Sequence, residues 1–97
     1  MDETLVLVAL DLSGRPYFSF DGEFRGQKMG EMETAMVREF FYAISYTAEM
    51  NLHMKILSGQ NDHHKAEALF KAFAKALDAA TEIDPRITDV LSTKGTI

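Results

Sequence analysis

The distribution of apolar residues along the first part of the chain predicts two strands. Residues 4–10 form a nearly continuous apolar run, which is typical of a strand buried on both faces. Since one layer of helices covers only one face of a sheet, we expect helices on both faces or a second subunit over one of them. A turn over residues 11–16, with Gly14 and Pro16, leads to residues 17–20, which we expect to be a second strand in a hairpin with the first.

The middle of the chain combines a glycine-rich loop with one clear strand. Residues 21–30 hold three glycines among charged residues, and we expect a loop there with a short irregular strand near Phe24. Residues 51–58 alternate, with apolar residues on one face and His53 and Lys55 on the other. This alternation predicts a strand with one face in the core and the other face exposed.

Two stretches show the periodicity of amphipathic helices. The first covers residues 31–50, and Glu31 and Glu33 suit the positive N-terminal end of such a helix. Its apolar stripe is wider than contact with one sheet face requires. The stripe therefore indicates either a helix buried within its own small core or a helix with one edge against a partner helix.

The second helical stretch runs from Asp62 to about Thr81. Asn61 or Asp62 can cap its N-terminus, and Pro85 favours its end. The remaining residues, 86–97, have the composition of a loop. The predicted order is β-β-α-β-α, which is an α+β fold with one layer of strands and one layer of helices.

Composition narrows the class of protein. Ninety-seven residues make a single small domain, residues 1–97, whose core is thin unless a partner covers part of its surface. The net charge of -5 and the scattered basic residues argue against general binding to nucleic acid or to anionic membranes. The chain has no cysteine, no apolar run of about 18 residues and an acidic start. We therefore expect a cytoplasmic protein without disulfides, thiolate metal ligands, a membrane span or a signal peptide.

All three histidines of the chain lie between positions 53 and 64, and two of them begin the second helix. His63 and Glu67 are four residues apart, and His64 and Glu67 are three apart, so both pairs can meet on a helix. Imidazole and carboxylate groups together suit Mn, Fe, Zn or Ni. The positive helix N-terminus disfavours imidazolium, so we expect these histidines to stay neutral and able to bind a metal ion.

The geometry of a helix separates the two adjacent histidines. Neighbouring side chains point about 100° apart, so His63 and His64 are poorly placed to bind one ion together, and as ligands they would serve two ions. One chain then offers too few ligands for each ion. We expect His53 to point away from the helix layer, which favours metal sites shared between subunits. The alternative is a capped helix start with two exposed histidines and a surface His53.

Several cationic and hydroxyl groups could bind a phosphate. Lys71 lies on the second helix, Arg15 lies in the first tight turn, and Ser92 and Lys94 lie close to a glycine near the C-terminus. Each of these groups taken alone is also what a solvated surface contains. Their spacing leaves both interpretations open.

Five motifs follow one another in a specific order: Leu10–Tyr17, Glu39–Phe41, Asn51–His53, Gly59–Ala72 and Ser92–Gly95. Their sequences are LDLSGRPY, EFF, NLH, GQNDHHKAEALFKA and STKG. In this order they resemble imidazoleglycerol-phosphate dehydratase, the lyase of histidine biosynthesis. The resemblance covers essentially the whole chain.

The resemblance is confined to the C-terminal half of that enzyme. The family's chain consists of two similar halves, each with its own His-His-x-x-Glu motif. The upstream half supplies an Asp-His-Met-Leu motif, a second His-His-x-x-Glu motif, an acidic residue implicated in catalysis and a further phosphate-binding arginine, none of which is present here. Since Met1 to Glu3 match the point where the second half begins, we expect a chain made as an isolated half of the enzyme.

The resemblance implies a fold like domain 2 of ribosomal protein S5, with two such units packed through their helices and active sites between the subunits of a large homo-oligomer. It implies that two Mn ions bind the imidazole of the substrate and act as Lewis acids while imidazole glycerol phosphate loses water to give imidazole acetol phosphate. The implied metal ligands are His53, His63, His64 and Glu67. The implied phosphate-binding residues are Arg15, Lys71, Ser92 and Lys94.

We expect the isolated half to fold, to self-associate at least as a homodimer, and to have little or no dehydratase activity, because the acid and the ligands of the upstream half are absent. Its Mn could be replaced by Ni, Zn or Fe. The expected partners are a small phosphate substrate and a second copy of the chain, and neither nucleic acid nor a membrane. The alternative is a non-catalytic, self-assembling half-domain whose metal- and phosphate-binding residues are vestigial.

Overall fold

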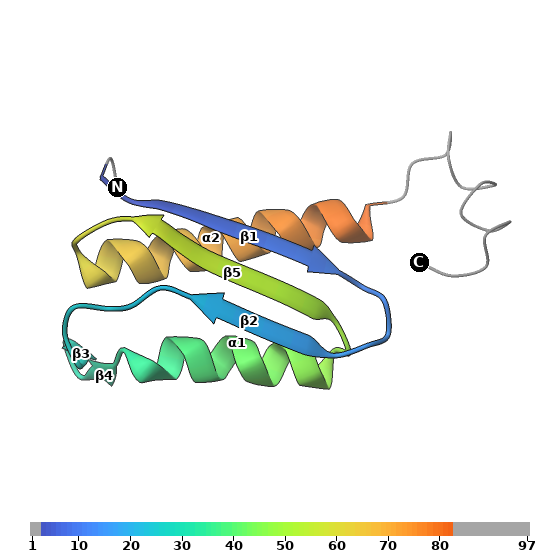
Figure 1. Ribbon diagram of the computed structural model, residues 1–97, viewed down its shortest axis with the longest axis horizontal. Helices are drawn as coiled ribbons and strands as arrows, with labels where there is room; N and C mark the ends of the chain where they lie inside the picture. Colours follow the sequence, from blue (N-terminus) through green and yellow to red (C-terminus); the bar gives the residue numbers. More distant parts are fainter. Residues whose placement is uncertain (1–2, 83–97) are drawn as a thin grey trace, which may run out of the picture.

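The computed structural model describes residues 3–82, which form a sheet with two helices on one side (Figure 1). The strands of this sheet are, in spatial order, β1 (Leu5–Asp11), β5 (Asn51–Ser58) and β2 (Tyr17–Asp21). Two short strands, β3 (Lys28–Met29) and β4 (Met32–Glu33), pair with each other. The helices are α1 (Ala35–Thr47) and α2 (Asp62–Thr81). The predicted α+β class and the β-β-α-β-α order of the main elements are confirmed.

β1 and β2 are not neighbours, so the predicted hairpin is wrong. β5 lies between them, antiparallel to β1 and parallel to β2. The segment 12–16 passes the start of β5, since Asp11 and Tyr17 both pair with Asn51, and the Tyr17 backbone N–H donates to the Met50 carbonyl at 3.1 Å. The central position lets β5 form backbone hydrogen bonds along both of its edges, which satisfies more of its buried backbone groups.

The side of the sheet that faces the helices is the core of the molecule. Leu52 and Met54 of β5 are buried there, together with Phe41 of α1 and Leu69 of α2. The predicted alternation of β5 is therefore confirmed, and its bounds coincide with the predicted residues 51–58.

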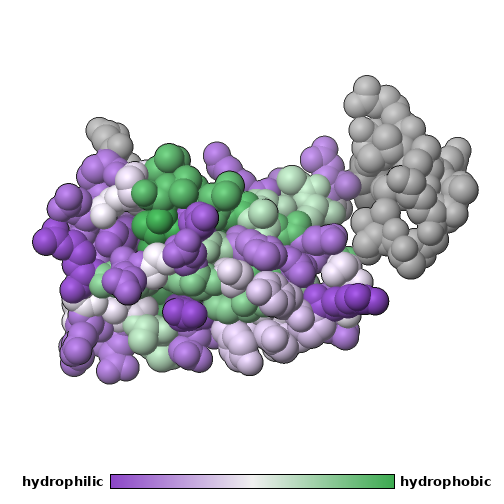
Figure 2. Space-filling model, viewed as in Figure 1, coloured by the Kyte–Doolittle hydropathy of each residue, from purple (hydrophilic) through white to green (hydrophobic). Residues whose placement is uncertain are grey.

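β1 differs from the prediction because only one of its faces is covered. Its residues alternate between half-buried and exposed, and Leu5 and Leu7 are 57% and 54% exposed. Figure 2 shows apolar side chains gathered on this outer face over β1 and the end of β5, where Leu57 is also exposed. The prediction that β1 is buried on both faces is therefore wrong within residues 3–82, because both helices lie on the same side of the sheet.

α1 begins at Ala35, later than the predicted helix. Residues 28–33 form the β3–β4 hairpin instead, and Gly30 in its turn has a left-handed φ of +64°. Glu31 and Glu33 therefore precede the helix, whose first turn contains no acidic residue. The predicted strand near Phe24 is also wrong, because Phe24 lies in a loop and packs against the core.

Only part of the broad apolar stripe of α1 is buried within the chain. Val37, Phe41 and Ser45 face the core, whereas Met36 and Phe40 are 49% and 45% exposed. The stripe is therefore wider than the surface that this sheet and α2 cover. The exposed part of the stripe, which includes Met36 and Phe40, forms the outer face of α1.

Local backbone structure ends α1 early, while α2 follows the prediction. α1 ends at Thr47 because Glu49 adopts a left-handed φ of +53° and the Met50 N–H donates to the Ser45 carbonyl at 2.9 Å. The predicted end at Met50 is thus wrong. α2 covers Asp62–Thr81, as predicted at both ends.

The predicted helix stop at Pro85 and the loop over 86–97 lie outside the described residues. Among residues 3–82, no helix combines the length and the apolar character that a membrane span requires. Within this part of the chain, the start of α2 lies next to the start of β1 and the end of β5 (Figure 1). Two of the three histidines are found there.

Candidate metal centre

The start of α2 is held by a side-chain cap and by a close approach of residues 3 and 4. Asn61, in an extended conformation, accepts a hydrogen bond from the His64 backbone N–H at 3.0 Å. Gly59 has a φ of +142°, and a Cβ atom there would lie 3.0 Å from the Thr4 hydroxyl. Glycine therefore allows residues 3 and 4 to pack against the turn that precedes the helix.

Asp62 ties the same helix end to the loop between β2 and β3. Its carboxylate accepts from the backbone N–H groups of Arg25 at 2.7 Å and Gly26 at 2.8 Å. The buried Lys65 ammonium lies 3.6 Å from this carboxylate and donates to the Glu23 carbonyl at 3.0 Å. Burial works to raise the pKa of Asp62, but the two backbone bonds and the Lys65 charge outweigh it and lower the pKa.

His63 and Glu67 line one surface pocket on α2. The other walls of this pocket come from Met29 and Met32 of the β3–β4 hairpin and from Phe70, with Ala66 between the two polar residues. The four-residue spacing thus places an imidazole and a carboxylate at the same pocket. Both are donors that suit Mn, Fe, Zn or Ni.

His64 contacts a different part of the molecule. Its Nδ1 lies 2.7 Å from Oε1 of Glu3, whose other oxygen accepts from the Thr4 hydroxyl at 2.6 Å and from the Gln60 N–H at 3.0 Å. The hydrogen bond from Thr4, followed by those from His64 and Gln60, lowers the pKa of Glu3 to about 2. His63 and His64 therefore lie in separate surroundings, in keeping with the helical geometry.

His53 lies on the exposed face of the sheet, away from both helices. Its neighbours Leu52 and Met54 are buried on the helix side of β5. The centroid of the His53 ring lies 5.4 Å from that of the Tyr17 ring in β2. Within one chain, His53 therefore does not share a site with the histidines of α2.

The described residues, 3–82, contain no group of three or more His, Asp or Glu side chains that could hold a metal ion. The four candidates occupy three places: the pocket on α2, the contact with Glu3, and the outer face of the sheet. Imidazole and carboxylate fit a transition-metal ion in type. The number that one chain brings together does not complete a coordination sphere, so a complete site would need ligands from another chain.

The candidate phosphate-binding residues are spread over the molecule. Arg15 is exposed in the β1–β2 connection, at the end of the sheet opposite to the start of α2 (Figure 1). Lys71 is exposed on α2. Ser92 and Lys94 lie outside the described residues, so their placement in a phosphate site stays a prediction.

Glu3 was not among the residues predicted from the sequence. It contacts His64 although 61 positions separate the two residues. The sequence contains only an indirect signal for the contact between Glu3 and His64. The antiparallel pairing of β1 with β5 places Leu5 opposite Ser58, and this register brings residue 3 to the turn before α2.

Comparison with known proteins decides the family. The model of the imidazoleglycerol-phosphate dehydratase family matches residues 1–77. Over 97 residues, all of this chain, the sequence is 64% identical to the imidazoleglycerol-phosphate dehydratase of Lachnoclostridium phytofermentans. The chain belongs to the imidazoleglycerol-phosphate dehydratase family. The imidazoleglycerol-phosphate dehydratase of Acetivibrio thermocellus is 60% identical over 95 residues, or 98% of this chain.

The chain spans about half the length of these curated relatives, 50% of the first and 49% of the second. Crystal structures of the family agree. The imidazoleglycerol-phosphate dehydratase of Staphylococcus aureus matches 87% of this chain with 49% of its own, at a TM-score of 0.84 and 44% identity. The Pyrococcus furiosus enzyme in complex with (S)-C348 matches 91% of this chain with 49% of its own, at a TM-score of 0.78 and 36% identity. The predicted family and the half-length match are confirmed.

Proposed function

We propose that the chain provides one half of a Mn-dependent imidazoleglycerol-phosphate dehydratase, a carbon–oxygen lyase of cytoplasmic histidine biosynthesis. The whole enzyme would remove water from imidazole glycerol phosphate and release imidazole acetol phosphate. The observation that carries the proposal is the placement of His63 and Glu67 on one pocket in a chain of the imidazoleglycerol-phosphate dehydratase family.

The metal-binding part of the proposal assigns His63 and Glu67 to one Mn ion, His64 to a second, and His53 to a site completed by another subunit. Bound Mn would supply a Lewis acid that polarises the imidazole of the substrate. The neutral imidazole groups offer lone pairs, and the Glu67 carboxylate offsets part of the positive charge. Ni, Zn or Fe could take the place of Mn, since the donor types suit all of them.

The phosphate-binding part of the proposal assigns Arg15, Lys71, Ser92 and Lys94 to the phosphate of the substrate. Guanidinium and ammonium groups form charge-assisted hydrogen bonds with phosphate oxygens. The β1–β2 connection, which contains Arg15, lies at the opposite end of the sheet from the start of α2 (Figure 1). One site would therefore combine the Arg15 of one copy with the metal ligands of another.

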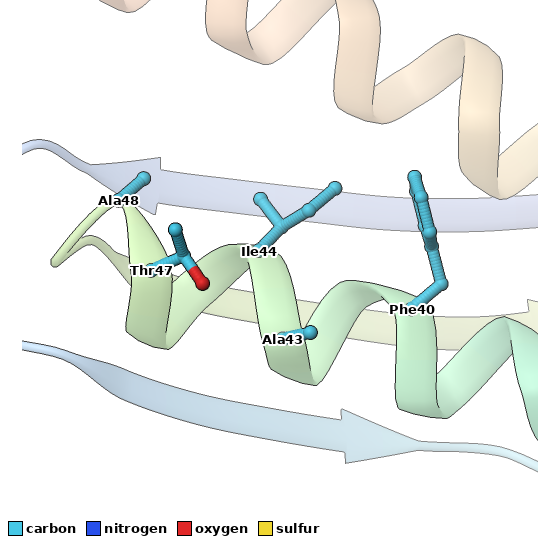
Figure 3. A pocket seen from close by; sticks show the side chains of 5 residues that line it. All are labelled: Phe40, Ala43, Ile44, Thr47 and Ala48. Atoms are coloured by element: carbon cyan, nitrogen blue, oxygen red, sulfur yellow. The ribbon is translucent and has the colours of Figure 1, made fainter.

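The outer face of α1 is the surface through which the chain would self-associate, at least as a homodimer. An apolar pocket on this helix is lined by Phe40, Ala43, Ile44, Thr47 and Ala48 (Figure 3). Apolar surface of this kind gains free energy when a second protein surface covers it. A second copy of the chain would supply that surface where the upstream half is absent.

A second candidate is a non-catalytic, self-assembling half-domain whose metal- and phosphate-binding residues have no role in the isolated chain. It is favoured by the separation of the candidate ligands, since no three of them come together within the described part of one chain. The two candidates differ in whether the chain binds Mn.

Metal titration after chelation separates these candidates. For the metal-binding half, Mn at 100 times its dissociation constant is expected to raise the free energy of unfolding by roughly 2.7 kcal/mol. Glu67→Gln is expected to reduce that gain, and Glu82→Gln at the other end of α2 serves as the matched control. A melting temperature that does not respond to Mn would favour the non-catalytic half-domain.

Activity measurements test the division of the enzyme into halves. The isolated chain is expected to show little or no turnover of imidazole glycerol phosphate, and clear turnover by the pure chain would contradict this. Mixing it with a separately produced upstream half is expected to restore activity. Glu67→Gln is expected to prevent the restoration, and Glu82→Gln is expected to allow it.

Sedimentation at micromolar concentration tests self-association. The wild-type chain is expected to sediment as a dimer or a larger oligomer. Phe40→Glu places a charge on the outer face of α1 and is expected to yield a monomer. Gln27→Glu adds a charge at an exposed polar position before β3, away from both apolar surfaces, and is the control expected to leave the oligomer intact. A monomeric wild-type chain would contradict the proposed dimer.

A further inference from the structure

A carboxylate from the first residues of the chain contacts one of the proposed metal ligands. Oε1 of Glu3 lies 2.7 Å from Nδ1 of His64. The contact joins a residue two positions before β1 to the first turn of α2, and it does not depend on a short-range helical spacing. Glu3 lies outside the family motifs that mark His64 as a ligand.

The carboxylate of Glu3 is held in place by groups other than the imidazole. Its Oε2 accepts from the Thr4 hydroxyl at 2.6 Å and from the Gln60 backbone N–H at 3.0 Å. Its backbone carbonyl accepts from the Ser58 hydroxyl at 3.3 Å. Two bonds thus orient the carboxylate and a third fixes its backbone, so the oxygen that meets His64 has a defined position before any ligand binds.

The polarity of the contact determines which nitrogen of the imidazole is free. An ionised carboxylate only accepts hydrogen bonds, so Nδ1 of a neutral His64 must carry the hydrogen. The lone pair of the ring is then on Nε2, which points away from the carboxylate. Metal-binding histidines commonly donate their second ring N–H to a carboxylate, which fixes the tautomer and the orientation of the ring.

We propose that Glu3 is a positioning residue that holds His64 as the Nδ1–H tautomer, with Nε2 as the atom that binds a divalent cation. The inference rests on the proposed function, because that function makes His64 a metal ligand. It adds a residue that acts on the ion only through His64. It also gives a residue that precedes the first strand a role in the site.

Nitrogen-15 NMR of the metal-free chain, at a pH where His64 is neutral, tests the tautomer directly. Wild type is expected to show His64 with the hydrogen on Nδ1. Glu3→Ala is expected to shift it towards Nε2, whereas Glu3→Gln keeps an acceptor oxygen and is expected to retain the wild-type tautomer. If Glu3→Ala does not fold, the wild-type spectrum alone decides, and a hydrogen on Nε2 in wild type overturns the proposal.

Titration with MnCl2, followed by the EPR signal of free Mn, tests the effect on binding. Glu3→Ala is expected to weaken binding at the His64 site by roughly 10–100-fold, and Glu3→Gln by less. Glu49→Ala removes one negative charge at the opposite end of β5 and is expected to leave the affinity unchanged. Equal affinities of wild type and Glu3→Ala would overturn the positioning role. Wild type that binds no Mn would refute the metal-binding part of the proposed function, while the NMR tautomer would still decide the role of Glu3.

Discussion

The start of α2 and the outer face of α1 differ in what surrounds them. At the start of α2, polar groups of residues 3–4, 23–26 and 60–65 bond to one another across long separations in sequence. On the outer face of α1, apolar side chains such as Met36 and Phe40 are about half exposed. The polar groups at the start of α2 are hydrogen-bonded within the chain, whereas the apolar side chains on the outer face of α1 remain half exposed to solvent.

The difference separates two kinds of surface within one small fold. A network of satisfied polar groups holds side chains in fixed orientations, which a ligand site requires. An exposed apolar helix face imposes no such orientation but gains free energy when it is covered. We therefore expect substitutions at the start of α2 to change local stability and ligand binding, and those on the outer face of α1 to change association.

Phe41 connects the two helices, and its removal is expected to have the largest effect on both regions. Its ring is fully buried, with centroids 4.8 Å from the Phe70 ring and 5.2 Å from the Phe73 ring of α2. Phe41→Ala is expected to lower the free energy of unfolding by about 3–5 kcal/mol, measured by urea denaturation. The neighbouring Phe40→Ala is the control and should cost about 1 kcal/mol. Equal costs would show that both faces of α1 are buried in solution.

Asp62→Asn is expected to have the next largest effect, because it removes the charge that binds two backbone N–H groups and the buried Lys65. A loss of about 1.5–3 kcal/mol in the free energy of unfolding is expected, as for hydrogen bonds to a charged group. Thermal and urea denaturation measure it. Asp78→Asn, on the exposed part of the same helix, should change stability by no more than about 0.5 kcal/mol. A similar small change for both variants would show that the start of α2 is not held by this carboxylate.

Acid should weaken the same region. The folded pKa of Asp62 is lower than its ordinary 3.8, so its contribution to stability is complete above about pH 3.8 and is lost as the pH falls through the folded pKa. Glu3, with a pKa of about 2 against 4.5, acts in the same direction between those two values. Circular dichroism during acid titration should show wild type losing stability below about pH 4.5. Asp62→Asn should lose less over this range, and parallel curves would contradict the assignment.

Asn61→Ala is expected to have the smallest effect of the series. It removes the side-chain oxygen that accepts from the His64 backbone N–H and should cost about 1 kcal/mol. Asn61→Asp keeps a capping oxygen and should restore most of that stability. Denaturation of both variants measures the difference. Equal losses for the two would mean that the cap hydrogen bond does not stabilise α2.

β5 and α2 could be predicted from the sequence because their signals are local. The alternation of residues 51–58 specifies which face is buried, and Asn61 marks the start of a helix whose periodicity runs to Thr81. The same local geometry placed His63 and Glu67 at one pocket and separated His64 from His63. The family resemblance, which depends on ordered motifs, was also available from the sequence and is confirmed.

Elements that depend on distant partners could not be predicted in this way. The hydrophobic pattern made β1 and β2 strands but did not show that β5 would insert between them. The periodicity of α1 continued upstream into residues that the β3–β4 hairpin uses instead. In both places a long-range or turn-specific pairing prevailed over a local preference.

By itself, the sequence determined the types of the main elements and the family of the chain, and it supplied the candidate metal ligands. The tertiary structure alone decided the strand order, the open face of β1 and the contact of Glu3 with His64. The physical reason is that local conformation follows from neighbouring side chains. Which distant groups meet depends instead on the register of the sheet, and here the pairing of Leu5 with Ser58 brings Glu3 to the start of α2.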